Sequence, residues 1–276
     1  LAGLNALQVL DLANTELQNL FGIGNLTNLS VLDLSSNEIS NLDALSTLTR
    51  LQNLDLEFNN VSDLSALSGL QNLEILKLGY NQVVSLDGLA GITSLQEIDL
   101  QYNQVENIDG LAGSINLQIL NLNSNQVGDL SSLAELVALQ DLRLWMNQVE
   151  DVTPLANLRS LEFLYLGNNR IRDLSPLAEL LQLDSLLVEW NFLDTGEGTD
   201  NLSVIDALLQ AGVRVSFEGQ KEARMEINSG VIQLAGKPGE TWSYALTFSN
   251  SGPRPLDYNF TTNVSWIQFD SPNGTL

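Results

Sequence analysis

The 22 residues LQDLRLWMNQVEDVTPLANLRS at 139–160 set the pattern from which the fold of this chain can be worked out. A leucine opens an equivalent unit every 22 residues, in nine units that show no drift. The opening leucines are Leu7, Leu29, Leu51, Leu73, Leu95, Leu117, Leu139, Leu161 and Leu183. Each unit reads L-x-x-L-x-L-x-x-N-x-(I/V/L), and only the first unit departs at the asparagine, with Thr15 in its place. Self-similarity at a fixed period indicates a repeat solenoid.

The first half of each unit predicts a short β-strand and a turn. In the L-x-L segment the two leucines point to one side of a strand, and the residue between them points to the other. The asparagine amide can bond backbone groups of the turn, and asparagine tolerates the unusual dihedrals found there. One unit cannot bury its own leucines, so the units must stack. We expect the stacked asparagines to bond the turn of one coil to that of the next.

The second half of each unit carries residues that favour the start of a helix. One slot holds only Asp, Ser or Thr, which are good N-cap residues, and the next slot contains Pro154 and Pro176, a residue favoured at the first helical position. The expected N-caps are Asp43, Ser65, Asp87, Asp109, Ser131, Thr153 and Ser175. We also assign four nearby aspartates to turns and caps rather than to chemistry: Asp63, Asp129, Asp151 and Asp173.

These units resemble the 22-residue leucine-rich repeats of bacterial internalins and of related SDS22-like proteins. The resemblance covers residues 1–195 and is carried by segments such as LRLWMNQVEDVTPLANLRS at 142–160. It implies an α/β solenoid: a horseshoe with a parallel β-sheet on its concave face and short helical or 3₁₀ turns on its convex face. It also implies adhesion to a host or neighbouring cell, but it names no receptor, because this solenoid serves many partners.

Three parts of the chain can be separated. The solenoid of residues 1–195 starts in the middle of a unit, since LAGL at 1–4 matches LAGI at 89–92, and we expect further repeats or a cap to precede it. In the expected cap at 196–221, LSVIDALLQA has helical spacing, with Asp200 or Asn201 as the N-cap, and VRVSFEG alternates like a strand.

The third part, residues 222–276, contains four segments that read as short strands: VIQLA, WSYALTFSN, LDYNFTT and SWIQF. Their alternation predicts a small β-sandwich. NSG at 250–252 and SWIQFDSPNGTL at 265–276 resemble bacterial immunoglobulin-like or BACON-type modules. Since such folds typically take about 100 residues, we expect this one to be truncated.

Composition excludes several classes of function. The 276 residues include no Cys and no His, which removes disulfides, Cys- or His-ligated metals and the usual catalytic triads. With 34 acidic against 11 basic residues, a net charge of −23 and a pI near 4.1, the chain lacks the basic face that nucleic acids or anionic membranes require. No stretch reaches the ~18 consecutive apolar residues of a membrane helix, so no direct membrane insertion is expected.

The outward side of the strands is where a solenoid is expected to bind its partner. Its N-terminal half is acidic and includes Asp11, Asp33, Asp55, Glu57, Glu97 and Asp99, with Lys77 among them. Its C-terminal half is aromatic, with Trp145, Met146, Phe163, Tyr165 and Trp190 around Arg143, continued toward the N-terminus by Tyr102, Tyr80 and Phe58. Trp, Tyr and Arg dominate interface hot spots. We therefore expect a protein partner here, but we expect Trp190 and Phe192 to pack under the cap.

The acidic half can be interpreted in several ways. Stacked like charges cost stability, so they indicate a basic partner or a bound cation, or simply the solvated face of an acidic protein. Calcium is disfavoured because no D-x-D-x-D-G loop is present. Asp55 and Asp99 beside Lys77 could imitate an acid/base set, but an open face is no catalytic pocket. We expect no catalysis and no cofactor.

The leading hypothesis is a non-enzymatic recognition protein that is secreted or lies on a bacterial surface and holds a protein partner on its concave face. Two alternatives stay open. One is an intracellular SDS22-like scaffold that regulates an enzyme. The other is a surface protein that binds carbohydrate through the aromatic face or the sandwich.

Overall fold

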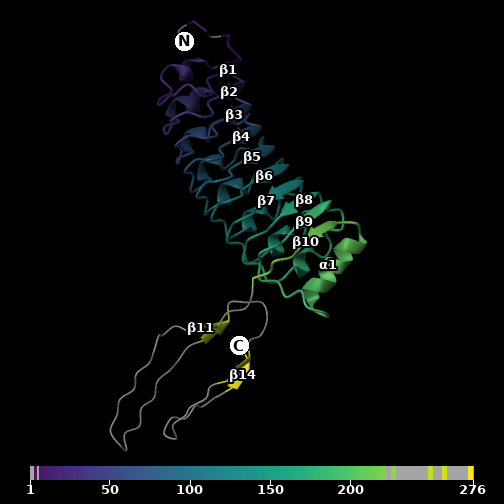
Figure 1. The fold of residues 1–276 in the computed structure, drawn as a ribbon. Helices are drawn as coiled ribbons and strands as arrows, with labels where there is room; N and C mark the ends of the chain where they lie inside the picture. The colour runs from purple at the N-terminus through teal and green to yellow at the C-terminus, as the bar shows by residue number, and fades with distance from the viewer. Residues whose placement is uncertain are drawn as a thin grey trace, which may run out of the picture.

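The computed structural model describes residues 3–4 and 6–221, followed by four short strands: β11 (Met225–Ile227), β12 (Phe248–Asn250), β13 (Asp257–Asn259) and β14 (Asn273–Thr275). Within residues 6–221 the chain winds as a solenoid (Figure 1), with one strand in each coil. Ten strands of the described region pair in chain order in a single sheet, and all of these pairs are parallel. The predicted leucine-rich repeat solenoid is therefore confirmed.

Every L-x-L segment contributes the centre of a strand, as the alternation predicts. The strands are β1 (Val9–Asp11), β2 (Val31–Asp33), β3 (Asn53–Asp55), β4 (Ile75–Lys77), β5 (Glu97–Asp99), β6 (Ile119–Asn121), β7 (Asp141–Arg143), β8 (Phe163–Tyr165), β9 (Ser185–Leu187) and β10 (Arg214–Ser216). Each strand is only three residues long, and the register pairs each residue with its equivalent in the next coil. A side chain and its repeats therefore form a straight row across the sheet.

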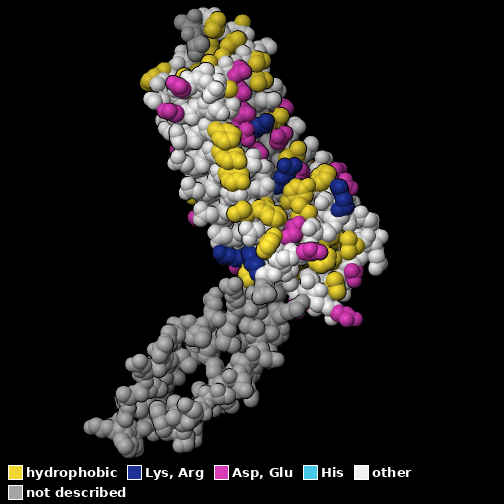
Figure 2. All heavy atoms as spheres, in the orientation of Figure 1, with side chains coloured by type: hydrophobic (Ala, Val, Ile, Leu, Met, Phe, Trp, Pro, Cys, Tyr) yellow, Lys and Arg dark blue, Asp and Glu magenta, His cyan; other side chains and the backbone are white. Residues whose placement is uncertain are grey.

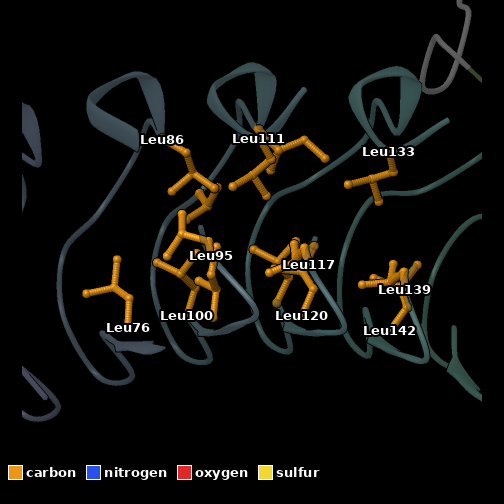
Figure 3. Packing of buried hydrophobic residues seen from close by; sticks show 14 of the residues in the cluster. Leu76, Leu86, Leu95, Leu100, Leu111, Leu117, Leu120, Leu133, Leu139 and Leu142 are labelled. Atoms are coloured by element: carbon orange, nitrogen blue, oxygen red, sulfur yellow. The ribbon is translucent and has the colours of Figure 1, made fainter. Parts of the chain in front are cut away.

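The core lies between the sheet and the opposite side of each coil. Leucines of the strands and leucines of the opposite side of each coil point toward one another there (Figure 3). Leu76, Leu95 and Leu111 are fully buried. Burial of such a side chain contributes roughly 1.5–3 kcal/mol. The hydrophobic residues that follow the asparagines, from Ile39 to Ile171, are buried as expected.

The helical turns are 3₁₀ helices, and their N-caps differ from those expected. The helices are η1 (Ile23–Asn25), η2 (Asp43–Thr47), η3 (Ser65–Leu67), η4 (Asp87–Leu89), η5 (Asp109–Leu111), η6 (Ser131–Leu133), η7 (Thr153–Leu155) and η8 (Ser175–Leu177). The expected cap residues are the first residues of η2 to η8, and none of these helices has a side-chain cap at the preceding residue. The acceptor instead lies two residues before the helix: Asp63 Oδ1 accepts the Ser65 N–H at 2.8 Å, and Asn41 Oδ1 accepts the Asp43 N–H at 2.9 Å.

The asparagines connect the coils as predicted. Asn125 Nδ2 donates to the carbonyls of Leu100 in the preceding coil and Leu122 in its own coil, at 2.9 and 3.1 Å. Its Oδ1 accepts the Val105 N–H at 2.8 Å. In the first coil, Thr15 Oγ1 donates to the Leu12 carbonyl at 2.7 Å and so supplies part of the same bonding.

The unusual backbone dihedrals fall one residue before the asparagine rather than on it. This slot has φ between 54° and 58° in every coil, and it is occupied by Asn14, Ser36, Phe58, Tyr80, Tyr102, Ser124, Met146, Asn168 and Trp190. The left-handed region costs an ordinary L-residue roughly 1–2 kcal/mol, and asparagine tolerates it best. Large aromatic residues at this slot are thus not chosen for their backbone preference.

The segment after β9 closes the C-terminal end of the solenoid with α1 (Asp200–Gln210) and β10. The predicted helix and strand are both present, but the N-cap is Thr199, whose hydroxyl accepts the Leu202 N–H at 3.4 Å, rather than Asp200 or Asn201. Asn201 is buried and joins α1 to the last coil, since it donates to the Arg172 carbonyl and accepts from the Leu174 N–H, both at 2.8 Å.

The predicted sandwich lies mostly outside the described residues. Strand β12 falls within the WSYALTFSN segment and β13 within LDYNFTT, whereas VIQLA and SWIQF are outside the part that the structure describes. Strand β11 pairs antiparallel with β12, and β13 with β14. No helix in the described part of the chain has the length and hydropathy to cross a membrane.

Candidate binding face

The outward side chains of the sheet form continuous rows because the register is exact from coil to coil. Asp11 lies beside Asp33, Asp33 beside Asp55, and Asp55 beside Lys77. The same row continues through Asp99, Asn121, Arg143, Tyr165 and Leu187. In Figure 2 acidic side chains predominate on this face over the N-terminal coils, and hydrophobic and basic side chains gather nearer to the cap.

Four aspartates of this row, which we call the acidic column, also stabilise the backbone. The Oδ1 atoms of Asp11, Asp33, Asp55 and Asp99 each accept the N–H two residues further on, at 2.9, 2.9, 3.0 and 2.9 Å. Asn121 accepts the Asn123 N–H at 3.1 Å in the same way. An uncharged amide therefore supplies the same acceptor, and Lys77, Arg143, Tyr165 and Leu187 occupy the equivalent slot of other coils without a carboxylate. The negative charge of the column is more than the fold needs.

The carboxylates of the acidic column repel one another. Burial raises the pKa of the Asp55 carboxyl, and the neighbouring Asp33 carboxylate raises it further, against the opposing effects of the Glu57 N–H and Lys77. Burial and the carboxylates of Asp55 and Asp99 likewise raise the pKa of Glu57. A cationic group brought to this part of the face would relieve the repulsion, because opposite charges favour the ionised form.

Side chains of the neighbouring coils cover Gly79, which is buried. A Cβ on Gly79 would lie 3.0 Å from Glu57 Oε1, 3.2 Å from Gln101 Cγ and 3.6 Å from Asp99 Oδ1, so the glycine lets these side chains approach the sheet closely. Asp99 Oδ2 is occupied, since Asn121 Nδ2 donates to it at 2.9 Å. Within the described residues, no three acidic side chains converge in a way that could hold a metal ion.

Three aromatic residues beside the sheet form a continuous stack, which we call the aromatic ladder. The ring centroids of Phe58 and Tyr80 are 4.3 Å apart with planes at 11°, and those of Tyr80 and Tyr102 are 4.5 Å apart with planes at 15°. All three side chains are exposed, at 49%, 39% and 50%. Because the three residues occupy the same left-handed slot of successive coils, their rings are in register. The aromatic ladder is therefore a rigid, largely apolar strip that is exposed to solvent.

The second aromatic group centres on Trp145. Its six-membered ring lies over Gly167 in the next coil so closely that a Cβ there would overlap Cζ3 and Cε3 and lie 2.9 Å from Cη2. The Trp145 indole therefore packs directly against the backbone of Gly167. Phe163 and Tyr165 of β8 are half-buried on the same face. Met146 occupies the left-handed slot of this coil and is 48% exposed.

Arg143 is held by its own strand. Its Nε and Nη2 atoms bond the two carboxylate oxygens of Asp141 at 3.0 and 2.6 Å, and its guanidinium lies 5.7 Å from the Tyr165 ring centroid. This bidentate pairing raises the pKa of Arg143. Asp141 neutralises the guanidinium and fixes its orientation beside the Tyr165 ring, a role that sequence reasoning missed.

The structure places the predicted residues in two groups on one face. The acidic column, with Glu57, Glu97 and Lys77, lies on the coils of β1 to β5, and the aromatic ladder lies on those of β3 to β5. The other group lies on the coils of β7 and β8 and consists of Trp145, Met146, Arg143, Phe163 and Tyr165. Trp190 lies with its indole against Gly219 of the cap, but it is 54% exposed, so it is not buried under the cap as expected. Phe192 is half-buried, with the cationic groups of Arg172 and Lys221 at 5.3 and 5.0 Å from its ring centroid.

A hollow at the C-terminal corner of the face was also missed. It is lined by Tyr165, Ser185 and Leu187 from β8 and β9, and by Leu209, Val213, Arg214, Val215 and Ser216 from the cap. Leu209 is 46% exposed. No sequence signal connects these residues, because the cap does not follow the 22-residue period.

Comparison with known proteins agrees with this architecture. The family model described as Leucine Rich repeats (2 copies) matches residues 5–47, 49–91, 93–135 and 137–179. No curated protein sequence matches the chain. Among solved structures, internalin C2 from Listeria monocytogenes is 39% identical, with a TM-score of 0.64 over 69% of this chain and 82% of that one. A leucine-rich repeat protein of Leptospira interrogans is 28% identical, with a TM-score of 0.69 over 79% of this chain and 56% of that one.

A plant receptor shares the architecture as well. The ectodomain of the membrane receptor kinase GASSHO1/SCHENGEN3 from Arabidopsis thaliana, in complex with CASPARIAN STRIP INTEGRITY FACTOR 2, is 29% identical, with a TM-score of 0.61 over 68% of this chain and 24% of the receptor. The family model covers more than half of the chain, and the chain covers more than two thirds of the internalin. The protein therefore belongs to the leucine-rich repeat family and is an internalin-like member of it.

Proposed function

We propose that the chain is a non-enzymatic recognition protein that holds a protein partner on the concave face of its sheet. The observation that carries the proposal is the aromatic ladder at the left-handed slot. The backbone there prefers asparagine, which Asn14 and Asn168 supply in other coils, yet three consecutive coils carry exposed aromatic rings. Residues that are kept where they strain the backbone indicate a function other than folding.

The rest of the face supports the same proposal. Trp145, Tyr165 and Arg143 are the residue types that dominate interface hot spots, and Gly167 and Asp141 hold two of them in place before any partner arrives. Preorganised side chains lose little conformational freedom on binding. The acidic column would steer a basic partner toward the face.

The solved neighbours support a protein partner, since the plant receptor ectodomain is seen in complex with CASPARIAN STRIP INTEGRITY FACTOR 2. The internalin likeness supports adhesion, and a location outside the cell or on a bacterial surface. Recovery of the native protein from the cell-surface or secreted fraction would support that location, and recovery from the cytosol would favour the intracellular scaffold. We also propose that residues 1–195, 196–221 and 222–276 act as solenoid, cap and a separate immunoglobulin-like module.

The carbohydrate alternative gains less from the geometry. Sugars stack on the open face of an aromatic ring, whereas both faces of Tyr80 are covered by its neighbours at 4.3 and 4.5 Å. The ladder offers mainly ring edges and two phenol groups along its length. A protein surface, which supplies apolar side chains and hydrogen-bonding groups together, suits it better.

Display selection tests the proposal directly. A library of peptides on phage is panned against the immobilised protein, and each selected binder is measured on a Trp145→Ala/Tyr165→Ala variant. We expect affinity to fall at least about 100-fold, because two hot-spot side chains are removed. The matched control is Val137→Ala/Leu181→Ala, which removes two side chains that are 55% and 48% exposed in the turns after η6 and η8. Binders that lose affinity only on the control would contradict the proposal.

A further inference from the structure

The charge of the sheet changes sign along the solenoid. Among the residues of β1 to β5, five carboxylates (Asp11, Asp33, Asp55, Glu97 and Asp99) stand against the single ammonium of Lys77, a net charge of −4. Among those of β6 to β10, the guanidiniums of Arg143 and Arg214 stand against Asp141, a net charge of +1. Glu57 and Glu189, two residues after the row in equivalent coils, add one negative charge to each half, so the net negative charge of the face is concentrated on the coils of β1 to β5.

The other half offers an apolar recess. The hollow at the C-terminal corner has apolar walls from both sides: Tyr165 and Leu187 from the sheet, and Leu209 and Val213 from the cap. Leu209 leaves 46% of its surface in water, although it belongs to the helix that closes the core. Ser185 and Ser216 supply polar groups in the lining, and Arg214 Nε donates to the Asp184 carbonyl at 3.3 Å, which holds that side chain beside the hollow.

The two regions lie at a definite separation. Six strand spacings separate Asp55 on β3 from Leu187 on β9, which is about 29 Å at ~4.8 Å for each spacing. An extended chain advances about 3.3 Å per residue, so about nine residues span the two regions. Trp145, in the coil of β7, lies between them and provides apolar contact along the way.

We propose that the face takes an extended segment of the partner protein in which a cluster of basic residues lies about nine residues from a bulky apolar residue. The basic side chains lie over Asp33, Asp55 and Glu57, where they relieve the repulsion between the carboxylates. The apolar side chain enters the hollow between β9 and α1. This inference rests on the proposed function and specifies the chemistry of the partner that it requires.

Synthetic peptides test the spacing. The probes are fluorescent peptides with three lysines and one phenylalanine separated by four or by nine Ser/Thr residues, in both orders along the chain, and a nine-residue version without the phenylalanine. Binding is measured by anisotropy on the full chain at about 0.15 M salt, where exposed charges are screened beyond about 8 Å. In at least one order, the nine-residue spacing should bind at least ten-fold more tightly than the four-residue spacing, which cannot reach both regions.

Matched variants separate the two contributions. Asp33→Asn/Asp55→Asn keeps the backbone acceptors, as Asn121 does in the same row, and should weaken the nine-residue peptide about ten-fold. Asp63→Asn/Asp129→Asn removes the same charge from turns where Asn41 and Asn107 show that asparagine suffices, and should change affinity less than two-fold. Leu209→Ser should abolish the advantage of the phenylalanine, and Leu181→Ser, at a leucine that is 48% exposed, should not. Circular dichroism confirms that each variant is folded.

The outcomes distinguish this inference from the proposed function. If display-selected binders depend on Trp145 and Tyr165 but the peptides show no preference for the nine-residue spacing, the inference fails and the proposed function stands. Equal weakening by the concave and the turn variants would also overturn the inference, because it would reduce the binding to the net charge of the whole protein. If no binder depends on the concave face, both fail.

Discussion

A methyl group added at Gly167 should displace the Trp145 indole from the concave face without changing the backbone. Gly167 is not among the residues with positive φ, so alanine can adopt its conformation. Its Cβ, however, would overlap two carbons of the indole and lie 2.9 Å from a third. Carbon atoms prefer separations of about 3.5–4.0 Å, so the ring must move by about 1 Å or more. We expect Gly167→Ala to lower the free energy of unfolding by about 1–3 kcal/mol, the usual effect of overpacking.

Urea denaturation measures this loss, and the tryptophan emission spectrum and near-ultraviolet circular dichroism report the change around the indole. The chain has 4 tryptophans, so the same spectra of Trp145→Phe identify the contribution of this one. The control is Gly113→Ala, where nothing lies within 4 Å of the added Cβ and φ is not positive. That change should be neutral or stabilise by about 0.4–1 kcal/mol.

A double-mutant cycle makes the test specific. In a Trp145→Ala background, Gly167→Ala should cost less than about 0.5 kcal/mol, because the ring that it overlaps is gone. If Gly167→Ala were as harmless as Gly113→Ala in the wild-type protein, or equally destabilising with and without Trp145, the indole would not rest on Gly167. The description of the face as preorganised would then be wrong.

Three other changes test the fold and its charges. Asn125→Ala should lower the free energy of unfolding by about 3–5 kcal/mol, because it leaves buried backbone groups of two coils without partners. Asn125→Thr should cost less, since Thr15, at the equivalent position of the first coil, makes part of the same hydrogen bonding. Equal losses for the two variants in urea melts would refute the role of the amide. Asp55→Asn should raise stability at pH 7 by up to about 1 kcal/mol. The pKa of Asp55 is raised on folding, so its ionised form weakens the fold; the gain should therefore fade as the pH falls through the raised pKa of the folded state, and be absent below the ordinary value of 3.8. A gain that grows toward acid pH in thermal melts would reverse this sign. Gly110→Ala should destabilise by about 1–3 kcal/mol, because its Cβ would overlap the Leu86 carbonyl, whose backbone cannot move aside; thermal stability like that of the wild type would show that the coils are less tightly packed there.

The solenoid could be predicted from the sequence because each coil repeats one local rule. Leucines three and five residues after an opening leucine, with an asparagine eight residues after it, determine a strand, a turn and a bond to the next coil. The errors were local ones of position. At the start of η2 to η8 the side-chain acceptor lies two residues before the helix, at residues such as Asp63, which the sequence did assign to a turn or cap, and not at the first helical residue, such as Ser65. Likewise, Thr199 rather than Asp200 or Asn201 caps α1, because the Thr199 hydroxyl accepts the Leu202 N–H.

The binding face was predictable only as a set of rows. The sequence shows which residues lie side by side, and so it places Asp55 beside Lys77, but it does not show how far a side chain reaches into the next coil. The overlap of Trp145 with the space above Gly167 depends on a rotamer, and the bidentate pairing of Arg143 with Asp141 depends on another. The hollow combines residues that are separated in sequence and follow no period, and it required the structure.

Photo-crosslinking tests the central claim, that the concave face binds the protein partner, most directly. A photoreactive phenylalanine is introduced at Gln101, which is half-buried on the face beside the aromatic ladder, or at Gln71, which is exposed in the turn after η3. Each variant is irradiated with the peptide binder recovered by display selection, and the products are mapped by mass spectrometry. A crosslink from position 101 and none from position 71 is the predicted result. Crosslinks of equal yield from both positions, or from position 71 alone, would contradict the claim.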